Sequence, residues 1–269
     1  MTWWEAALLG LLQGLTEFLP VSSSGHLVIG QYVLGLPPGD DVVFEVFVHF
    51  GTTLSIIFFY RETLLRLLFK GLAALRRPGS ITASYREDED IRTIVFVGLT
   101  MIPTGIVYVV FKETIEAAFA DPQFAAGMLL ITGALLLLTR LRPNPSGDLT
   151  PLKSLLIGVA QSIAMLPGIS RSGSTICAAL YLNVKPEKAA NFSFLMLLPV
   201  VIGATLLKTA EVFETGVADW APIIVGTVIA FFSGILAIGL VLDFVRKGRL
   251  QYFAWYCFAV GTIGLLMIP

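Results

Sequence analysis

One polar stretch occurs twice in this chain, first as Gln13-Gly-Leu-Thr-Glu17-Phe-Leu-Pro20-Val-Ser22-Ser23-Ser24-Gly25-His26 and again as Gln161-Ser-Ile-Ala-Met-Leu-Pro167-Gly-Ile-Ser170-Arg171-Ser172-Gly173. Corresponding residues lie 148 positions apart. Each copy is an apolar run that breaks at a proline and then carries several hydroxyl groups and one basic side chain. Within an apolar chain, such breaks have to be satisfied by protein or by water in a cavity. The pair is therefore the predicted active centre.

The composition around this pair is that of an integral membrane protein. The 269 residues are 56% hydrophobic and 14% charged, with a mean hydropathy of +0.83, and several apolar runs approach the roughly 20 residues that cross a bilayer. The first ten residues contain Glu5 and no Lys or Arg, so they lack the basic region of a cleavable signal peptide. No basic stripe is present, and no nucleic acid is expected as a partner. Cys177 and Cys257 lie in apolar stretches and are interpreted as buried hydrophobic residues rather than a disulfide.

Apolar periodicity predicts an all-α chain. Four short helices flank the two polar stretches, over residues 3–19, 25–34, 152–166 and 174–182. Six longer segments are predicted membrane spans, over residues 43–69, 91–111, 124–141, 189–207, 222–244 and 253–268. The charged segment 76–90 is predicted as a solvated loop, and 143–147 as a linker.

The repeat extends beyond the two polar stretches. Phe44 aligns with Phe192 at the same offset of 148, and Val97-Gly98 matches Val225-Gly226 at an offset of 128. The difference of 20 is roughly the length that segment 76–90 adds to the first half. We interpret the chain as one membrane domain (1–269) built from a duplication, with repeats at approximately 1–141 and 152–269.

Basic residues are concentrated in four connections, represented by Arg61 to Arg92, by Arg140, Arg142 and Lys153, by Lys185 and Lys188, and by Arg246 to Arg249. The other two connections hold only Lys112 and Lys208, so the positive-inside rule places the first four in the cytoplasm. Three spans separate the two polar stretches. All four basic clusters lie on the cytoplasmic side if the first polar stretch enters the membrane from outside and the second enters it from the cytoplasm. The predicted fold is thus an all-α polytopic membrane protein, an inverted-topology repeat with six full transmembrane helices and two re-entrant helix-loop-helix hairpins.

The first hairpin tip carries an intramembrane carboxylate. Gln13 and Glu17 are four residues apart and share a helix face. With no basic residue near it in sequence, Glu17 indicates a cation, a proton or a distant Arg partner. The serines at 22–24 precede a helix whose free N–H groups suit an anion such as phosphate, although one of them is expected to cap that helix. His26 is either a satisfied core histidine or, beside these groups, a general acid/base or nucleophile.

The second tip supplies a guanidinium group. Arg171 is the one basic residue at the predicted membrane depth, and its planar fork matches phosphate oxygens. The alternative is a structural Arg that binds helix C-terminal carbonyls. Hydroxyl groups follow the break at Pro167-Gly168, at Ser170, Ser172, Ser174 and Thr175. Together the two tips hold the groups required for phosphoryl transfer, with a divalent metal as an option.

Two motifs, Glu17-Phe-Leu-Pro20-Val-Ser-Ser-Ser-Gly25-His26 and Leu166-Pro-Gly-Ile-Ser170-Arg-Ser-Gly-Ser-Thr175, resemble the signatures of the bacitracin-resistance type undecaprenyl-diphosphate phosphatases. The resemblance covers nearly the whole chain, including Phe44-Glu45-Val46 and Asn191-Phe-Ser193-Phe. It implies removal of the terminal phosphate from undecaprenyl diphosphate, which recycles the lipid carrier for peptidoglycan synthesis, cell wall biogenesis and cell shape and underlies resistance to the antibiotic bacitracin. It also implies a multi-pass protein of the bacterial cytoplasmic membrane with a site open to the outer face.

The resemblance further implies a divalent cation, Mg²⁺ or Ca²⁺. The family has Gln or Glu at the position of Gln13, so Glu17 is the main candidate for metal ligand or base here. The expected catalytic residues are Glu17, Ser23, His26 and Arg171. Either Ser23 attacks with assistance from His26, or His26 activates a water molecule, and both routes stay open. The expected substrate-binding residues are Gln13, Ser22, Ser24, Ser170, Ser172, Ser174 and Thr175.

The competing hypothesis is a transporter. Inverted repeats with broken helices also occur in proteins that move ions or lipids, so the chain could flip a lipid phosphate or carry another anion. The discriminating feature is His26 beside the three serines, which transport alone does not require. The expected partners are a polyprenyl diphosphate and membrane lipids. The lipid's chain length and a homodimer stay open.

Overall fold

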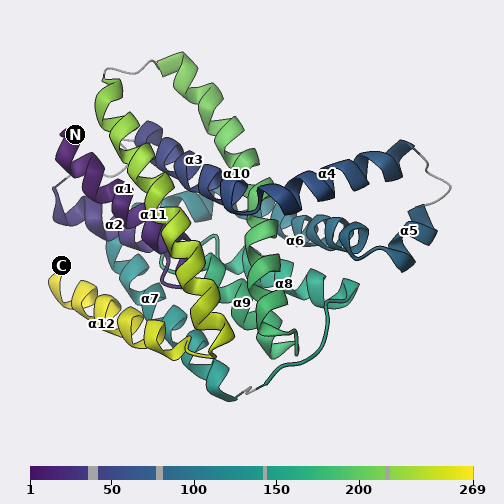
Figure 1. Ribbon diagram of the computed structural model, residues 1–269. Coiled ribbons are helices and arrows are strands. Elements are labelled where there is room, and N and C mark those ends of the chain that lie inside the picture. The colour runs from purple at the N-terminus through teal and green to yellow at the C-terminus, as the bar shows by residue number, and fades with distance from the viewer. Residues whose placement is uncertain (36–41, 77–80, 142–143, 216–218, 269) are drawn as a thin grey trace.

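The computed structural model describes residues 1–35, 42–76, 81–141, 144–215 and 219–268, but not the side chains of residues 42, 81, 204 and 206–215. In these ranges the chain is helical apart from turns, connecting segments and an isolated β-bridge between Gly147 and Val184. Figure 1 shows the arrangement of α1 (Trp3–Phe18), α2 (Ser23–Val33), α3 (Val42–Phe59), α4 (Arg61–Arg76), α5 (Ile81–Glu87), α6 (Glu89–Ala118), α7 (Pro122–Leu138), α8 (Pro151–Ile163), α9 (Arg171–Tyr181), α10 (Pro186–Thr215), α11 (Trp220–Arg246) and α12 (Gln251–Met267).

Several of these helices have the length and apolar composition of membrane spans. Three qualify individually among the described residues: α6, α7 with the 3₁₀ turn that follows it, and α11. The bent pair of α3 and α4 would add a fourth if it is counted as one span, and α12 is a shorter apolar helix. The prediction of an all-α polytopic membrane protein is confirmed at this level. The count of six spans stays a prediction.

The prediction of one continuous span over 43–69 is wrong. Helix α3 ends at Phe59, α4 begins at Arg61, and the two axes are bent by 81°. The charges of Arg61 and Glu62 stand at this bend. Helix α4 buries none of its residues and exposes both apolar and basic side chains, for example Leu75 and Arg76. This is the composition of an amphipathic helix.

The segment predicted as a solvated loop over 76–90 contains a helix, α5, and the start of α6. Asp88 caps α6 by accepting a hydrogen bond from Asp90 N at 2.8 Å. Lys70 of α4 forms ion pairs with both carboxylates, 2.8 Å from Asp88 and 2.7 Å from Asp90. The Lys70 ammonium group holds the pKa of Asp88 below its usual value. The charges of this segment therefore join α4 to the beginning of α6.

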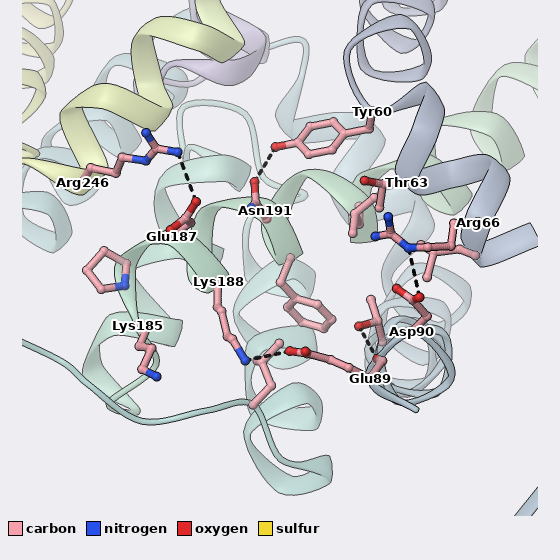
Figure 2. Close-up of a pocket in the computed structure, with 16 residues that line it drawn as sticks. Tyr60, Thr63, Arg66, Glu89, Asp90, Lys185, Glu187, Lys188, Asn191 and Arg246 are labelled. Carbon is pink, nitrogen blue, oxygen red and sulfur yellow. Dashed lines mark hydrogen bonds and ion pairs between the residues drawn. The ribbon is translucent and has the colours of Figure 1, made fainter. Parts of the chain in front are cut away.

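The structure brings basic clusters that are distant in sequence together on one face of the molecule. A cavity of about 670 Å³ opens between α4, α6, α10 and the end of α11 (Figure 2). Its lining includes Arg66, Lys185, Lys188 and Arg246. Lys188 lies 2.7 Å from Glu89 of α6 and 2.9 Å from Asp148, which follows the linker. The pair with Glu89 joins the second half of the chain to the first at this face.

The halves also pack through reciprocal helix pairs that depend on glycine. Helix α1 of the first half crosses α11 of the second so closely that a Cβ atom on Gly10 would lie 2.8 Å from Gly226 Cα. Helix α8 of the second half crosses α6 of the first in the same way, because a Cβ atom on Gly158 would lie 2.8 Å from Thr100 O. Small residues permit such close approach of helices in membranes. The repeat hypothesis stays a prediction, and this exchange of partners is compatible with it.

Candidate active site

The first polar stretch folds as a helix, a turn and a second helix. Helix α1 ends at Phe18 and α2 begins at Ser23. Ser22 adopts a positive φ of 70° and caps α2, its Oγ accepting from Gly25 N at 3.3 Å. One of the three serines therefore is the helix cap that the sequence predicts. Gln13 and Glu17 lie on one face of α1 and are buried, with a hydrogen bond of 2.9 Å from Gln13 Nε2 to Glu17 Oε2.

The second polar stretch has the same form. Helix α8 ends at Ile163 and α9 begins at Arg171. Ser170 caps α9 by accepting from Gly173 N at 3.0 Å. Thr132 of α7 holds the turn from the side, because its hydroxyl donates to Gly168 O at 2.8 Å and accepts from Ser170 N at 3.0 Å.

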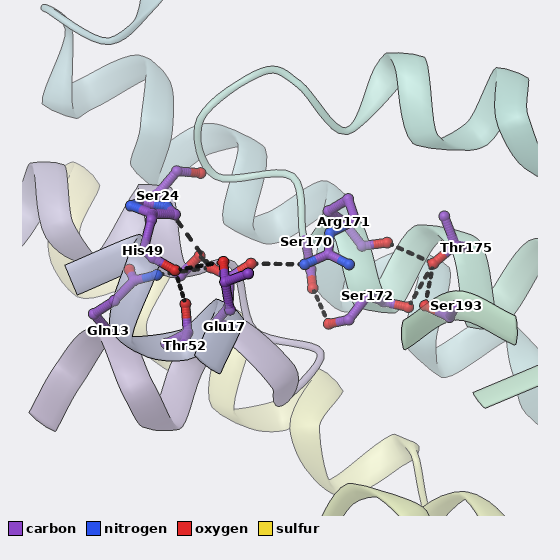
Figure 3. Close-up of polar contacts among 12 residues, drawn as sticks. Gln13, Glu17, Ser24, His49, Thr52, Ser170, Arg171, Ser172, Thr175 and Ser193 are labelled. Carbon is purple, nitrogen blue, oxygen red and sulfur yellow. Dashed lines mark hydrogen bonds and ion pairs between the residues drawn. The ribbon is translucent and has the colours of Figure 1, made fainter. Parts of the chain in front are cut away.

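The two tips meet inside the protein (Figure 3). Arg171 Nη2 lies 2.6 Å from Glu17 Oε1, and exposed fractions of 15% and 7% make this a largely buried ion pair. The turns themselves touch, since a Cβ atom on Gly25 would lie 2.8 Å from Gly168 Cα. Of the three partners that the sequence left open for Glu17, the structure shows the distant Arg. The alternative for Arg171 was a structural role in which it binds helix carbonyls. Its Nη2 instead binds the Glu17 carboxylate.

The second oxygen of Glu17 faces a serine. Ser23 Oγ donates to Glu17 Oε2 at 2.6 Å, the same oxygen that accepts from Gln13 Nε2. A hydroxyl that donates a short hydrogen bond to a carboxylate has the geometry of a nucleophile and its base. Glu17 therefore connects Ser23 on one side to Arg171 on the other.

The two partners of Glu17, Ser23 and Arg171, stand at corresponding positions of the two polar stretches. Ser23 and Arg171 are 148 positions apart, the offset between the two polar stretches, and each is the first residue of its helix. Residue 165, the position that corresponds to Glu17, is Met165. One carboxylate thus interacts with the corresponding position of both polar stretches.

The predicted substrate-binding hydroxyls divide into two groups. Ser22, Ser24 and Ser170 line a small cavity of about 30 Å³ together with Glu17, Ser23 and Arg171. Three others do not line it. Ser172 Oγ donates to Leu19 O at 3.2 Å and lies 3.3 Å from Ser170 Oγ, Thr175 Oγ1 lies 2.6 Å from Ser193 Oγ of α10, and Ser174 is buried in α9. A cavity of this volume holds about one water molecule.

Two buried polar atoms at this site have no hydrogen-bond partner among the described residues. They are Arg171 Nη1 and Gln13 Oε1. A buried group without a partner costs about 1–3 kcal/mol, and more if it is charged. The donor on Arg171 suits an oxygen of an anion such as phosphate.

The same observation tests whether a divalent cation fits. No group of three or more His, Cys, Asp or Glu side chains gathers among the described residues. Mg²⁺ is commonly held by one or two carboxylates together with substrate phosphates. Glu17 beside the unpartnered Gln13 Oε1 provides such an incomplete set, which a bound diphosphate would complete. The residues fit the cation on this basis.

His26 is engaged away from this centre. Its Nδ1 lies 2.7 Å from Ser22 O and its Nε2 2.9 Å from the hydroxyl of Tyr256. The ring also stacks on Tyr256, with centroids 5.5 Å apart and planes at 6°. Both ring nitrogens therefore have partners other than Ser23 and Glu17. This is the arrangement of a satisfied core histidine, one of the two interpretations that the sequence left open.

A different histidine lies beside Glu17. His49 of α3 places Nε2 3.8 Å from Glu17 Oε2 and is 32% exposed (Figure 3). His49 is not among the predicted site residues, because the sequence pattern of 43–69 predicts an ordinary apolar span. The available signal was an imidazole in that span, four residues after Glu45.

An apolar cavity adjoins the polar centre. It has a volume of about 310 Å³ and shares Ser24 with the small cavity. Apart from Glu45, His49 and Thr205, its other walls are aliphatic or aromatic: Leu27, Val28, Val46, Phe119, Val200 and Val201. A polar centre with an adjoining apolar cavity suits a ligand that has an anionic head and an apolar chain.

Comparisons with known proteins agree with this chemistry. A family model described as "Bacitracin resistance protein BacA" matches residues 6–263. A Salinibacter ruber protein named undecaprenyl-diphosphatase is 57% identical over 270 residues, and the match covers 100% of both chains. Proteins of the same name from Syntrophotalea carbinolica and Desulfatibacillum aliphaticivorans are 42% and 38% identical, over 97% and 99% of each chain.

Proposed function

Because the chain belongs to the bacitracin resistance protein BacA family, we propose that it hydrolyses undecaprenyl diphosphate to undecaprenyl phosphate and inorganic phosphate. The names of its relatives support this substrate. The observation that carries the proposal is the Glu17 carboxylate, which accepts from Ser23 Oγ at 2.6 Å and pairs with Arg171 at 2.6 Å. A phosphatase requires a nucleophile with a base and a positive group beside the phosphate, and these residues provide both. Transport alone does not require them.

The substrate binds with its diphosphate at the two tips. Arg171 Nη1 donates a hydrogen bond to a phosphate oxygen, and the free N–H groups at the starts of α2 and α9 are further donors. Ser22, Ser24 and Ser170 supply hydroxyls around them. The first isoprene units lie in the adjoining apolar cavity. Since the polar cavity holds about one water, the tips have to move apart to admit a phosphate group.

Ser23 Oγ attacks the terminal phosphorus. Its proton passes to Glu17 Oε2, a Ser23 Oγ–phosphorus bond forms, and the bond from that phosphorus to the bridging oxygen breaks. Undecaprenyl phosphate leaves and takes the proton from Glu17, which restores the carboxylate. Water then hydrolyses the phosphoserine. In this route His26 holds the turn through Ser22 O, whereas direct attack by a water activated by His26 would require its ring to leave both present partners.

A divalent cation, Mg²⁺ or Ca²⁺, would be held by Glu17 and Gln13 Oε1 with the diphosphate, and it would neutralise negative charge on the substrate. Arg171 shares that task from the second tip. The donor that Arg171 presents is fixed by its ion pair with Glu17, which orients the guanidinium plane before substrate arrives.

The finer topology belongs to the same proposal. Six transmembrane helices cross a bacterial cytoplasmic membrane, and the pairs α1–α2 and α8–α9 are re-entrant hairpins whose tips meet at depth. The burial of Glu17 supports this arrangement. So does the gathering of Arg66, Lys185, Lys188 and Arg246 around one cavity at the face that the positive-inside rule makes cytoplasmic. The polar centre then opens to the outer face.

A phosphate-release assay on purified protein with a polyprenyl diphosphate and Mg²⁺ tests the function. We expect Ser23→Ala, Glu17→Gln and Arg171→Ala each to lose at least about 100-fold in rate, since each removes a group at the reacting phosphorus. Ser146→Ala, at an exposed linker position, is the matched control and should retain wild-type rates. Wild-type protein that releases no phosphate, or Ser23→Ala at full activity, would contradict the proposal.

A further inference from the structure

The orientation of the His49 ring is fixed by the backbone of α3. Nδ1 lies 2.8 Å from Glu45 O. A carbonyl oxygen accepts and never donates, so Nδ1 carries the hydrogen and Nε2 is left with a lone pair in the neutral imidazole. The hydroxyls of Thr52 and Thr53 both donate to His49 O at 2.8 Å, which holds this turn of the helix in place.

His49 Nε2 faces the oxygen that binds Ser23. The distance from Nε2 to Glu17 Oε2 is 3.8 Å, and Ser23 Oγ lies 2.6 Å from that same Oε2. Two acceptors at 3.8 Å do not hydrogen-bond to each other. One water molecule can donate a hydrogen to each of them at about 2.8 Å. A water in this position would share its carboxylate oxygen with Ser23.

Water can reach this position from the adjoining cavity. His49 is 32% exposed, and it lines that cavity together with Ser24 and Glu45. His26 has no comparable position, because its Nε2 is bound to the Tyr256 hydroxyl. Of the two imidazoles in the chain, His49 is the one that reaches both the reacting centre and the cavity.

We propose that His49, with Glu17, holds the water that hydrolyses the phosphoserine, so that it is a positioning residue for the second half of the reaction. The inference rests on the proposed function and on Ser23 as the nucleophile. Glu17 takes one proton from the water, the water oxygen bonds to phosphorus, and the bond from phosphorus to Ser23 Oγ breaks. Ser23 Oγ receives the proton from Glu17. The second water hydrogen, directed at His49 Nε2, leaves with the phosphate.

Two substitutions separate the hydrogen-bond acceptor from the bulk of the ring. His49→Phe keeps a planar ring of similar size and has no acceptor, whereas His49→Gln keeps an acceptor. Rapid-quench kinetics measure the formation of lipid phosphate and of inorganic phosphate separately. For His49→Phe we expect a burst of about one lipid phosphate per enzyme at the wild-type rate, followed by turnover slowed on the order of 100-fold. Phosphoserine accumulates in acid-quenched samples, KM is not raised, and His49→Gln recovers most of the turnover.

Other outcomes would overturn the role. Turnover of His49→Phe within two-fold of wild type shows that no water depends on this residue. Loss of the burst, with a raised KM, shows that His49 binds substrate instead. If His49→Phe does not purify as a folded protein, His49→Met, which also lacks a strong acceptor, takes its place under the same criteria. Wild-type protein that releases phosphate without forming phosphoserine overturns this inference and leaves the phosphatase function standing, whereas wild type that releases no phosphate removes both.

Discussion

The ion pair between Glu17 and Arg171 makes a prediction that separates stability from chemistry. The two side chains are 7% and 15% exposed, and their closest atoms are 2.6 Å apart. Unit charges about 4 Å apart attract by about 4 kcal/mol at an effective dielectric constant of about 20. Removing one partner of a buried pair costs about 3–5 kcal/mol, because the remaining charge stays buried without compensation. We therefore expect Arg171→Met to lose about 3–5 kcal/mol of unfolding free energy.

Removing both charges should restore most of that loss. In the double variant Glu17→Gln with Arg171→Met no charge stays unpaired, and we expect it to unfold within about 1–2 kcal/mol of wild type. Phosphate release should nevertheless be absent from the double variant and from both single variants. The control is Arg246→Met, whose partner Glu187 is 61% exposed, and it should cost less than about 1 kcal/mol.

The assay is reversible unfolding of the detergent-solubilised protein in a denaturing detergent, followed by circular dichroism, in parallel with phosphate release. A single variant as stable as wild type would show that the pair is solvated rather than buried. A double variant no more stable than Arg171→Met would show that coupling between the two charges does not account for the loss. Phosphate release in the double variant at wild-type rates would refute the site assignment itself.

Three further predictions follow from the packing, the charges and the cation. Gly226→Ala should destabilise the protein, because its Cβ would meet an aromatic ring of α3, whereas Gly239→Ala on the same helix has open space and should be neutral; equal thermal midpoints would contradict this. Lys188 lowers the pKa of Asp148, so the stability from this pair is present above the unfolded pKa of about 3.9 and lost as the pH falls through the lower folded pKa. The stability difference between wild type and Lys188→Met should accordingly shrink below about pH 4, and a constant difference from pH 6 to pH 3 would refute the assignment. Chelation of divalent cations should stop phosphate release, and Gln13→Leu should raise the cation concentration needed for half-maximal rate; an unchanged concentration would remove residue 13 from the cation site.

Much of the fold is predictable from local pattern, and the errors have identifiable causes. Broken helices flanking Pro20 and Pro167 follow from proline and hydroxyl residues in an apolar run, and α1, α2, α8 and α9 all lie within a few residues of prediction. The bend at residue 60 was missed because the apolar residues of α4 continue the run of α3 in the sequence. Their helical spacing among Arg and Lys residues was the signal for an amphipathic helix.

The site shows where local reasoning ends. Glu17, Ser23 and Arg171 were selected as polar residues at depth, and the structure brings these three together. The sequence predicts a catalytic role for His26 because it follows Glu17 and the three serines, yet its ring is directed toward Tyr256 of α12. The position of His49 depends on how α3 crosses α1, and no spacing within one segment of the sequence encodes that crossing.

The hypothesis of a duplication would account for the use of a single carboxylate. Ser23 and Arg171 occupy equivalent positions, at the first residue of a helix whose preceding serine caps it. Two copies of an anion-binding turn that met with identical residues would place two serines against two carboxylates. Such a site would have no cation of its own and an excess of negative charge that repels a diphosphate. Compared with such a pair of identical tips, Arg171 in place of a serine and Met165 in place of a glutamate amount to one more positive charge and one fewer negative charge. The remaining Glu17 then accepts the proton of Ser23 on one oxygen and orients Arg171 with the other.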